Sequence, residues 1–116
     1  NTPIYLQVIN KIKKDIITGE IKGGDKLPSV RELSQRLKVN PNTVQRAYQE
    51  LEREEITFSQ RGIGTFVKED ESMIISMKTN MASQALNNFI TNMLELGFSK
   101  DEILNEVSKK INKGDK

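Results

Sequence analysis

The chain of 116 residues contains no cysteine and no histidine. Without cysteine, disulfides and thiolate metal sites are excluded. Without histidine, the commonest metal ligand and the commonest general base are missing. The carboxylates fall mostly at predicted helix caps or on predicted helix surfaces, and no pair is marked out for acid and base chemistry. We therefore expect no enzyme, no cofactor and no bound metal ion.

The sequence also lacks tryptophan, and no apolar run approaches the roughly 18 residues that cross a bilayer. No cationic start leads into an apolar signal segment, so we expect a cytoplasmic protein without a membrane partner. The chain begins with Asn1 and not with Met, which leaves open whether native residues precede it. At this size the core is modest, and support from a second copy would not be surprising.

Charge is distributed unevenly along the chain. Residues 1–68 carry 12 Lys and Arg against 8 Asp and Glu, a net charge of +4, while residues 69–116 carry 6 against 8, a net charge of −2. A mildly basic first half suits a polyanionic partner, although most domains of this charge bind no nucleic acid.

The most informative stretch is residues 39–53, VNPNTVQRAYQELER, which has the pattern of a two-faced helix. Its apolar arc contains Val44, Ala47, Tyr48 and Leu51, and its polar side contains Asn42, Arg46, Gln49 and Arg53. Amides and guanidinium groups can form paired hydrogen bonds with the edges of adenine and guanine in the major groove. Because most exposed helix faces are merely solvated, this face alone makes the helix only a candidate DNA reader.

Two further helices are predicted before this stretch. Thr2 is expected to cap the first helix, with Pro3 as its first residue and Gly19 as its stop. Its apolar stripe consists of Tyr5, Val8, Ile9, Ile12, Ile16 and Ile17. A loop over residues 19–28 follows, with Ile21 and Leu27 as candidate anchors in the core.

The second helix should begin with a capping box formed by Ser29 and Glu32 and end near Lys38. Its predicted inner face is formed by Val30, Leu33 and Leu37. A tight turn then leads to Asn40 as N-cap and Pro41 as the first residue of the third helix.

Beyond Glu55 the periodicity becomes that of strands. Ile56 and Phe58 alternate with Thr57 and Ser59, turn residues occupy 60–64, and a β-branched and aromatic run follows at 65–67. A hairpin directly after a helix-turn-helix is the wing of a winged helix. Its two glycines permit positive φ at the tip, where Arg61 also lies.

A charged run at residues 68–71 predicts a boundary between a winged helix-turn-helix at 1–68 and a helical region at 69–116. A long helix is predicted over 72–96 with Gly97 as its stop, and a capping box at Ser99 opens a last helix. The inner face of that last helix is expected to contain Ile103, Leu104, Val107 and Ile111. Methionines 73, 77, 81 and 93 are spaced for packing and not for metal binding, and residues 113–116 should fray.

Four segments in this order resemble the GntR family of bacterial transcription regulators: PIYLQ at 3–7, GDKLPSVRELS at 24–34, NPNTVQRAY at 40–48 and RGIGTFV at 61–67. The short C-terminal region looks like that of the YtrA subfamily. The resemblance implies a mainly α winged helix-turn-helix with a small β-hairpin, followed by a two-helix dimerisation element. For that subfamily it also implies a homodimer and control of operons that often encode ABC transporters.

The resemblance also implies which residues contact DNA. It places Arg31 near the phosphate backbone, Asn42, Thr43, Gln45 and Arg46 on the recognition helix, and Arg61 with Gly62 at the wing. Two positions depart from the family pattern. Glu55 replaces a common glycine, so the turn into the hairpin is in question, and Ile63 replaces a common lysine, which puts one wing contact with phosphate in doubt.

Four of these candidates also have a simpler interpretation. Arg46 could pair with Glu50 instead of reading guanine, and Asn42 could bond to the helix N-terminus instead of adenine. Arg31 could balance Glu32, although a cation at a helix start opposes the helix dipole. Thr43 and Gln45 suit phosphate or sugar contacts. Arg61 could simply be a solubilising charge.

We therefore expect a homodimeric regulator, more naturally a repressor, that binds a pseudo-palindromic operator in double-stranded DNA. Its predicted dimerisation surface consists of Ala82, Ala85, Leu86, Phe89, Ile90 and Met93. The alternative is a winged-helix protein-interaction module without specific DNA binding. Two helices are too small to enclose a ligand pocket of about 300 Å³ or more. Any small-molecule effector should therefore sit at the dimer interface or between it and the winged helix, and the other route of control is the level of the protein itself.

Overall fold

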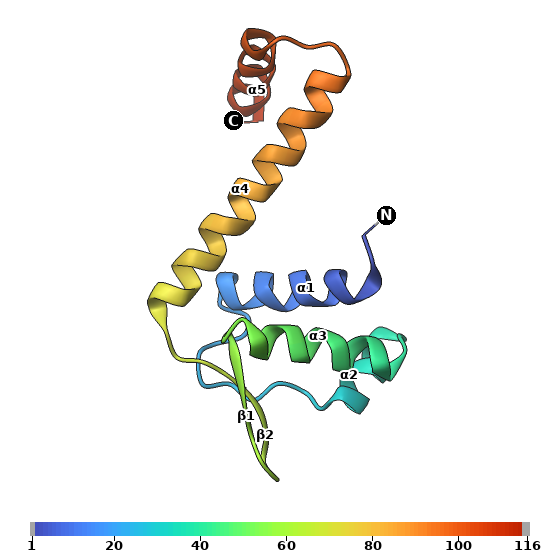
Figure 1. Cartoon of the computed structure of the whole chain (residues 1–116). Helices are drawn as coiled ribbons and strands as arrows, with labels where there is room; N and C mark the ends of the chain where they lie inside the picture. The colour runs from blue at the N-terminus through green and yellow to red at the C-terminus, as the bar shows by residue number, and fades with distance from the viewer. Residues whose placement is uncertain (1, 115–116) are drawn as a thin grey trace. The chain divides into compact units, whose positions relative to one another are not determined.

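The computed structural model describes residues 2–114 and confirms the mainly α class with one small hairpin (Figure 1). The elements are α1 (Ile4–Thr18), α2 (Val30–Leu37), α3 (Pro41–Arg53), β1 (Thr57–Gln60), β2 (Gly64–Val67), α4 (Glu71–Glu95) and α5 (Lys100–Gly114). The chain divides between Lys78 and Thr79 into two compact units. The first contains the helix-turn-helix and its wing, and the second contains most of α4 and all of α5.

The core of the first unit lies between α1 and α3. α3 contributes Val44, Ala47 and Leu51, each with no exposed surface, together with Tyr48, so the predicted apolar arc is confirmed. α1 contributes Val8, Ile9, Ile12 and Ile16. Leu27 anchors the loop between α1 and α2 in this core, as expected, and Ile21 packs against it.

The start of α1 differs from the expectation by one residue. The helix begins at Ile4 and Pro3 occupies the N-cap position, so the predicted cap at Thr2 is wrong. Pro3 has a ψ of 147°, which is extended and not helical, and none of the described side chains caps the helix. The Pro3 carbonyl instead accepts hydrogen bonds from the Leu6 and Gln7 N–H groups at 3.1 and 3.2 Å. The helix ends as predicted at Gly19, which has a φ of 86°.

The capping box of α2 is present. The Ser29 hydroxyl accepts a hydrogen bond from the Glu32 N–H at 3.0 Å, and the Glu32 carboxylate accepts one from the Ser29 N–H at 2.9 Å. The expected inner face is right for Leu33 but wrong for Leu37, which is 37% exposed. The helix has already ended at Leu37, with Lys38 in the left-handed region, so Leu37 lies at the rim of the core.

The tight turn between α2 and α3 is closed by the predicted cap. The Asn40 side chain accepts a hydrogen bond from the Asn42 N–H at 2.8 Å, and Pro41 is the first residue of α3. At the other end of α3, Glu55 has a φ of 62°. The residue at the turn into the hairpin therefore has the left-handed conformation that glycine favours, although it is a glutamate.

The hairpin pairs Thr57 with Val67 and Phe58 with Phe66. Thr57 and Val67 are buried, whereas the rings of Phe58 and Phe66 stack with centroids 5.8 Å apart. The expected alternation of Ile56 and Phe58 with Thr57 and Ser59 is wrong, because Ile56 and Thr57 are both buried and Phe58 is 37% exposed. Ile56 precedes the strand and its N–H donates to the Leu51 carbonyl, and within the strand only Thr57 is buried.

The long C-terminal helix begins in the first unit, where Met77 is buried in the core and Met73 and Ile74 pack against it. Among the described residues no helix is long and apolar enough to span a membrane. No cluster of acidic residues in the described part of the chain is arranged to hold a metal ion.

In the second unit, Gly97 ends the long helix with a φ of 94° and the Ser99 capping box opens α5. Of the predicted inner face of α5, Ile103 is buried, but Leu104 and Ile111 are 70% and 63% exposed. That part of the prediction is wrong for a single chain, because the described residues leave most of the surface of these two side chains uncovered. Helix α5 runs through Lys113 to Gly114, and the fraying expected for residues 115 and 116 lies outside the described residues.

Candidate nucleic-acid interface

The first half of α3 presents the predicted recognition residues. Asn42, Gln45 and Arg46 are exposed and Thr43 is half-buried. The opposite face of the same helix supplies fully buried core residues, so the backbone that carries these polar groups is firmly held. A rigid element suits a site that must present several hydrogen-bonding groups in fixed positions.

Arg46 contacts an aromatic ring and not the carboxylate considered from the sequence. Its guanidinium carbon lies 3.8 Å from the centroid of the Tyr5 ring on α1. Glu50, the alternative partner, instead accepts a hydrogen bond from Arg53. The sequence predicted Tyr5 as part of the apolar stripe of α1. The pattern within one helix could not indicate that the Tyr5 ring also contacts a side chain of α3.

Arg31 is exposed in the first turn of α2, as predicted. Its neighbour Glu32 is engaged in the capping box. Hydrogen bonds from the Ser29 backbone N–H and side chain lower the pKa of Glu32. The cation of Arg31 therefore stands at the end of the helix where the dipole disfavours positive charge, and an anionic partner would relieve that cost.

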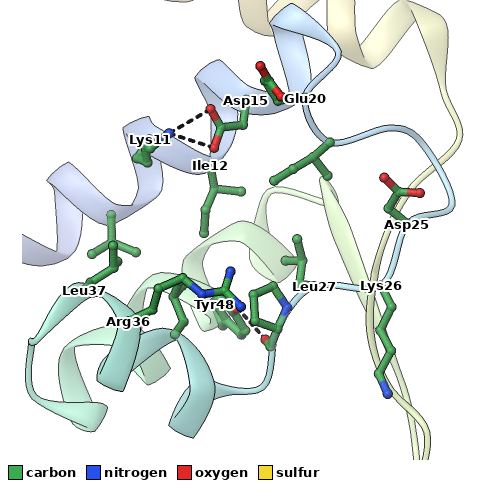
Figure 2. Close-up of a pocket in the computed structure, with 14 residues that line it drawn as sticks. Lys11, Ile12, Asp15, Glu20, Asp25, Lys26, Leu27, Arg36, Leu37 and Tyr48 are labelled. Atoms are coloured by element: carbon green, nitrogen blue, oxygen red, sulfur yellow. Dashed lines mark hydrogen bonds and ion pairs between the residues drawn. The ribbon is translucent and has the colours of Figure 1, made fainter.

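The tip of the wing is formed by Arg61, Gly62 and Ile63, between the two strands. Gly62 has a φ of 79° in open space, and Ile63 is 57% exposed. Lys26 lies across the other wing glycine. A Cβ atom added at Gly64 would come within 2.6 Å of Lys26 Cε, and the Lys26 side chain follows the hairpin in Figure 2. The Lys26 side chain therefore places a positive charge beside the wing, although Ile63 at the tip is apolar. No sequence pattern indicated this position of Lys26.

The start of α2 and the wing border one hollow of about 280 Å³. Its lining includes Ser29, Val30 and Glu32 from the start of α2, Ile63, Gly64 and Thr65 from the wing, and Lys26 between them. The structure thus brings the region around Arg31 close to the wing.

A larger hollow of about 520 Å³ lies between α1, the following loop and α2 (Figure 2). Its lining is apolar at Val8, Ile12, Leu27, Leu33 and Leu37, and charged at Lys11, Asp15, Glu20, Asp25, Lys26 and Arg36. Lys11 and Asp15 form an ion pair at 3.0 Å across one side of it. Its volume falls within the range of small-molecule sites.

Comparisons with known proteins agree with this arrangement. Residues 4–67 match the family described as bacterial regulatory proteins, gntR family. The uncharacterized HTH-type transcriptional regulator YhcF of Bacillus subtilis is 44% identical over 102 residues, covering 88% of this chain and 84% of YhcF. The HTH-type transcriptional repressor YtrA of the same organism is 38% identical over 120 residues, covering 100% of this chain and 92% of YtrA.

Two solved structures are also similar. A GntR family transcriptional regulator from Listeria monocytogenes superposes with a TM-score of 0.83 at 45% identity, covering 94% of this chain and 96% of that one. The DNA-binding domain of AraR in complex with operator ORX1 has a TM-score of 0.55 at 34% identity, covering 58% of this chain and 81% of that one.

These relatives are transcriptional regulators and not enzymes. The chain has the winged helix-turn-helix of these relatives, and the match to YtrA extends over the whole length of this chain. It is a DNA-binding transcriptional regulator that belongs to the GntR family of bacterial regulatory proteins.

Proposed function

We propose that this regulator is a homodimeric repressor that binds a pseudo-palindromic operator. The observation that carries the proposal is the exposed polar face of α3, from Asn42 to Arg46, on a helix whose other face is fully buried. Such a helix can enter a major groove without losing its own support.

Within this interface the residues have different roles. Arg46 and Asn42 read base edges, because their side chains match the paired hydrogen-bonding groups of guanine and adenine. Thr43 and Gln45 contact phosphate or sugar, as half or more of such contacts do. The cations of Arg31 and Arg61, with the backbone at Gly62, hold the DNA backbone at the start of α2 and at the wing. Lys26 adds a phosphate contact beside the wing that compensates for the apolar Ile63.

The second unit supplies the dimer interface. Its apolar side chains are poorly covered within one chain, with Leu86 58%, Phe89 36% and Ile90 39% exposed. The proposed interface combines these with the exposed Ala82 and Ala85 and the half-buried Met93. Large exposed apolar surfaces of this kind mark sites of association. Two copies would place two recognition helices in successive major grooves, with half-sites roughly 10 bp apart.

Repression is supported by the similarity to YtrA, which is a transcriptional repressor, and by simple occlusion, because a bound dimer can block polymerase. The resemblance to the YtrA subfamily makes an operon for an ABC transporter the first target to examine. A protein with this role works in the cytoplasm, where the chromosome lies.

The test is selection of bound sequences from random double-stranded DNA by the full chain, followed by fluorescence anisotropy at two salt concentrations. The expected result is one enriched motif with two inverted half-sites and an affinity that falls as salt rises. Enrichment of no motif, together with no measurable affinity for the protein's own upstream region at low salt, would contradict the proposal. That outcome would favour the alternative, a protein-interaction module that docks through the apolar surface of α4 and α5.

Control by an effector is a second part of the proposal. We expect control through the level of the protein or through a small molecule at the dimer interface, with the hollow of about 520 Å³ as a competing location. A thermal-shift screen of metabolites tests this. A stabilising compound whose effect disappears in Leu86→Glu would indicate the interface, one whose effect disappears in Leu37→Glu would indicate the hollow, and no stabilising compound would count against an effector.

A further inference from the structure

We propose that Tyr5 is a positioning residue for operator recognition: its ring holds the Arg46 guanidinium in one orientation, so that α1 as well as α3 sets base specificity. The inference rests on the proposed function, in which Arg46 reads a base. It adds a residue outside the helix-turn-helix to the determinants of the operator sequence.

The contact is built on packed elements. Tyr5 lies in the first turn of α1, is half-buried, and packs against the core that α1 and α3 share. Arg46 is exposed on α3, and its guanidinium carbon lies 3.8 Å from the Tyr5 ring centroid. A cation over the face of an aromatic ring at this distance is attracted by the negative face of the ring. The position of the ring is fixed by packing, so the ring fixes the guanidinium.

The geometry suits base reading because a guanidinium has two chemically different surfaces. Its planar face stacks on aromatic rings, whereas its N–H donors project from its edge. A guanidinium that lies over the Tyr5 ring by its face leaves the donors at its edge free for the two acceptors of guanine in the major groove. A side chain already held in place loses less conformational freedom on binding, and affinity gains accordingly.

The decisive variants are Tyr5→Leu, which keeps apolar bulk but removes the aromatic face, and Tyr5→Phe, which keeps the face and removes the hydroxyl. Tyr5→Leu is expected to weaken operator binding by about 2- to 30-fold, the range covered by exposed and desolvated cation–π contacts. Tyr5→Phe is expected to bind within about twofold of wild type, because its ring keeps the face that attracts the cation.

The test measures anisotropy with the selected operator and its single-base variants, for both Tyr5 variants, Arg46→Ala and the double variant Tyr5→Leu/Arg46→Ala. The expected result is that Tyr5→Leu relaxes discrimination at the same base pair as Arg46→Ala and causes no further loss in the Arg46→Ala background. A merely structural role would instead weaken all sequences alike. Thermal unfolding of each variant and its affinity for random DNA provide the controls for folding.

Three results would overturn this inference without affecting the proposed function. Tyr5→Leu could keep full operator affinity and discrimination, or it could cause the same loss of affinity in the Arg46→Ala background as in wild type. The third is that Tyr5→Phe binds the operator as weakly as Tyr5→Leu. If Tyr5→Leu fails to fold, NMR of wild type and Tyr5→Phe decides. The Arg46 side-chain resonances should show an upfield ring-current shift in both, and unshifted resonances would overturn the inference. Absence of any sequence preference in the wild type, by contrast, would overturn the proposed function.

Discussion

The hydroxyl of Tyr48 donates a hydrogen bond to the carbonyl of Pro28 at 2.6 Å. Tyr48 belongs to α3 and is 7% exposed, while Pro28 ends the loop that leads into α2. The bond therefore ties the helix that carries the recognition residues to the start of the helix-turn-helix. Tyr48 was expected to be a core residue, and it is one, but its polar end also fixes how the loop enters α2.

Tyr48→Phe should lower the free energy of unfolding by about 0.5–1.5 kcal/mol, because the ring still fills the core but the hydrogen bond is lost. Urea denaturation measures the change. Tyr5→Phe is the matched control and should have little effect, since its ring is the more exposed of the two. Equal stability of Tyr48→Phe and wild type would show that the hydrogen bond contributes nothing net.

Tyr48 also predicts a dependence of stability on pH. Burial raises the pKa of Tyr48 to about 12 from its ordinary value of 10.0. The folded state therefore holds the phenol proton more tightly than the unfolded state does. This contribution is fully present below about pH 10 and is lost as the pH rises through about 12. The measurement is the difference in urea stability between wild type and Tyr48→Phe at pH 9, 10 and 11, because this difference cancels the contribution of groups that both proteins share. The difference should shrink with pH, and a constant difference would contradict the assignment.

Much of this fold follows from local patterns. The capping box at Ser29, the cap at Asn40 and the stops at Gly19 and Gly97 depend on residues close in sequence, and the structure has all of them. The apolar arc of α3 follows in the same way from helical periodicity. These features were therefore accessible without a structure.

The errors arise where tertiary structure decides. The face of Phe58 depends on where the strand begins, which the turn after α3 sets by bonding Ile56 to Leu51. The contact of Arg46 with Tyr5 requires α1 to pack against α3, and the place of Lys26 beside Gly64 requires the loop to pair with β2. None of these contacts leaves a periodic signal in one segment.

Glu55→Gly should stabilise the protein by up to about 1 kcal/mol. Glu55 has a φ of 62°, a left-handed conformation that costs residues with a side chain roughly 1–2 kcal/mol. Glycine removes this cost, but it offsets part of the gain because it has greater conformational freedom in the unfolded chain. Its exposed ion pair with Lys68, at 3.4 Å, is worth little. The change is measured as the shift in the urea midpoint. Loss of stability on Glu55→Gly would mean that the ion pair outweighs the backbone strain.

Gly62→Ala is the reverse experiment at the wing. Gly62 has a φ of 79° and an added Cβ would meet nothing within 4 Å, so only backbone strain is introduced. The expected cost is about 0.5–1 kcal/mol, the left-handed penalty less the entropy that alanine removes from the unfolded chain. Urea denaturation again gives the value. A cost well above 2 kcal/mol would show that the tip packs more closely than the open space around Gly62 indicates.

Arg46→Ala and Arg31→Ala should have different effects on DNA binding. Loss of a base-reading arginine should cost about 1–3 kcal/mol and relax specificity at one base pair, whereas loss of a phosphate contact should weaken binding to all sequences and reduce the salt slope by about 1. Lys26→Ala should behave as Arg31→Ala does. Anisotropy with operator and random DNA at several salt concentrations separates the two patterns. Equal losses on specific and random DNA for Arg46→Ala would exclude its role in reading a base.

Leu86→Glu should convert the dimer to a monomer. Leu86 is 58% exposed in the single chain, so a charge is tolerated there before association, but an interface that covers it would have to bury an unpaired carboxylate at a cost of several kcal/mol. Ile75→Glu is the matched control, because Ile75 is 63% exposed on the same helix and lies outside the proposed interface.

Sedimentation equilibrium should give a dimer for wild type and for Ile75→Glu, and a monomer for Leu86→Glu. The monomer should also bind a full operator no better than a half-site, because it carries only one recognition helix. A Leu86→Glu protein that stays dimeric would place the interface elsewhere on the chain.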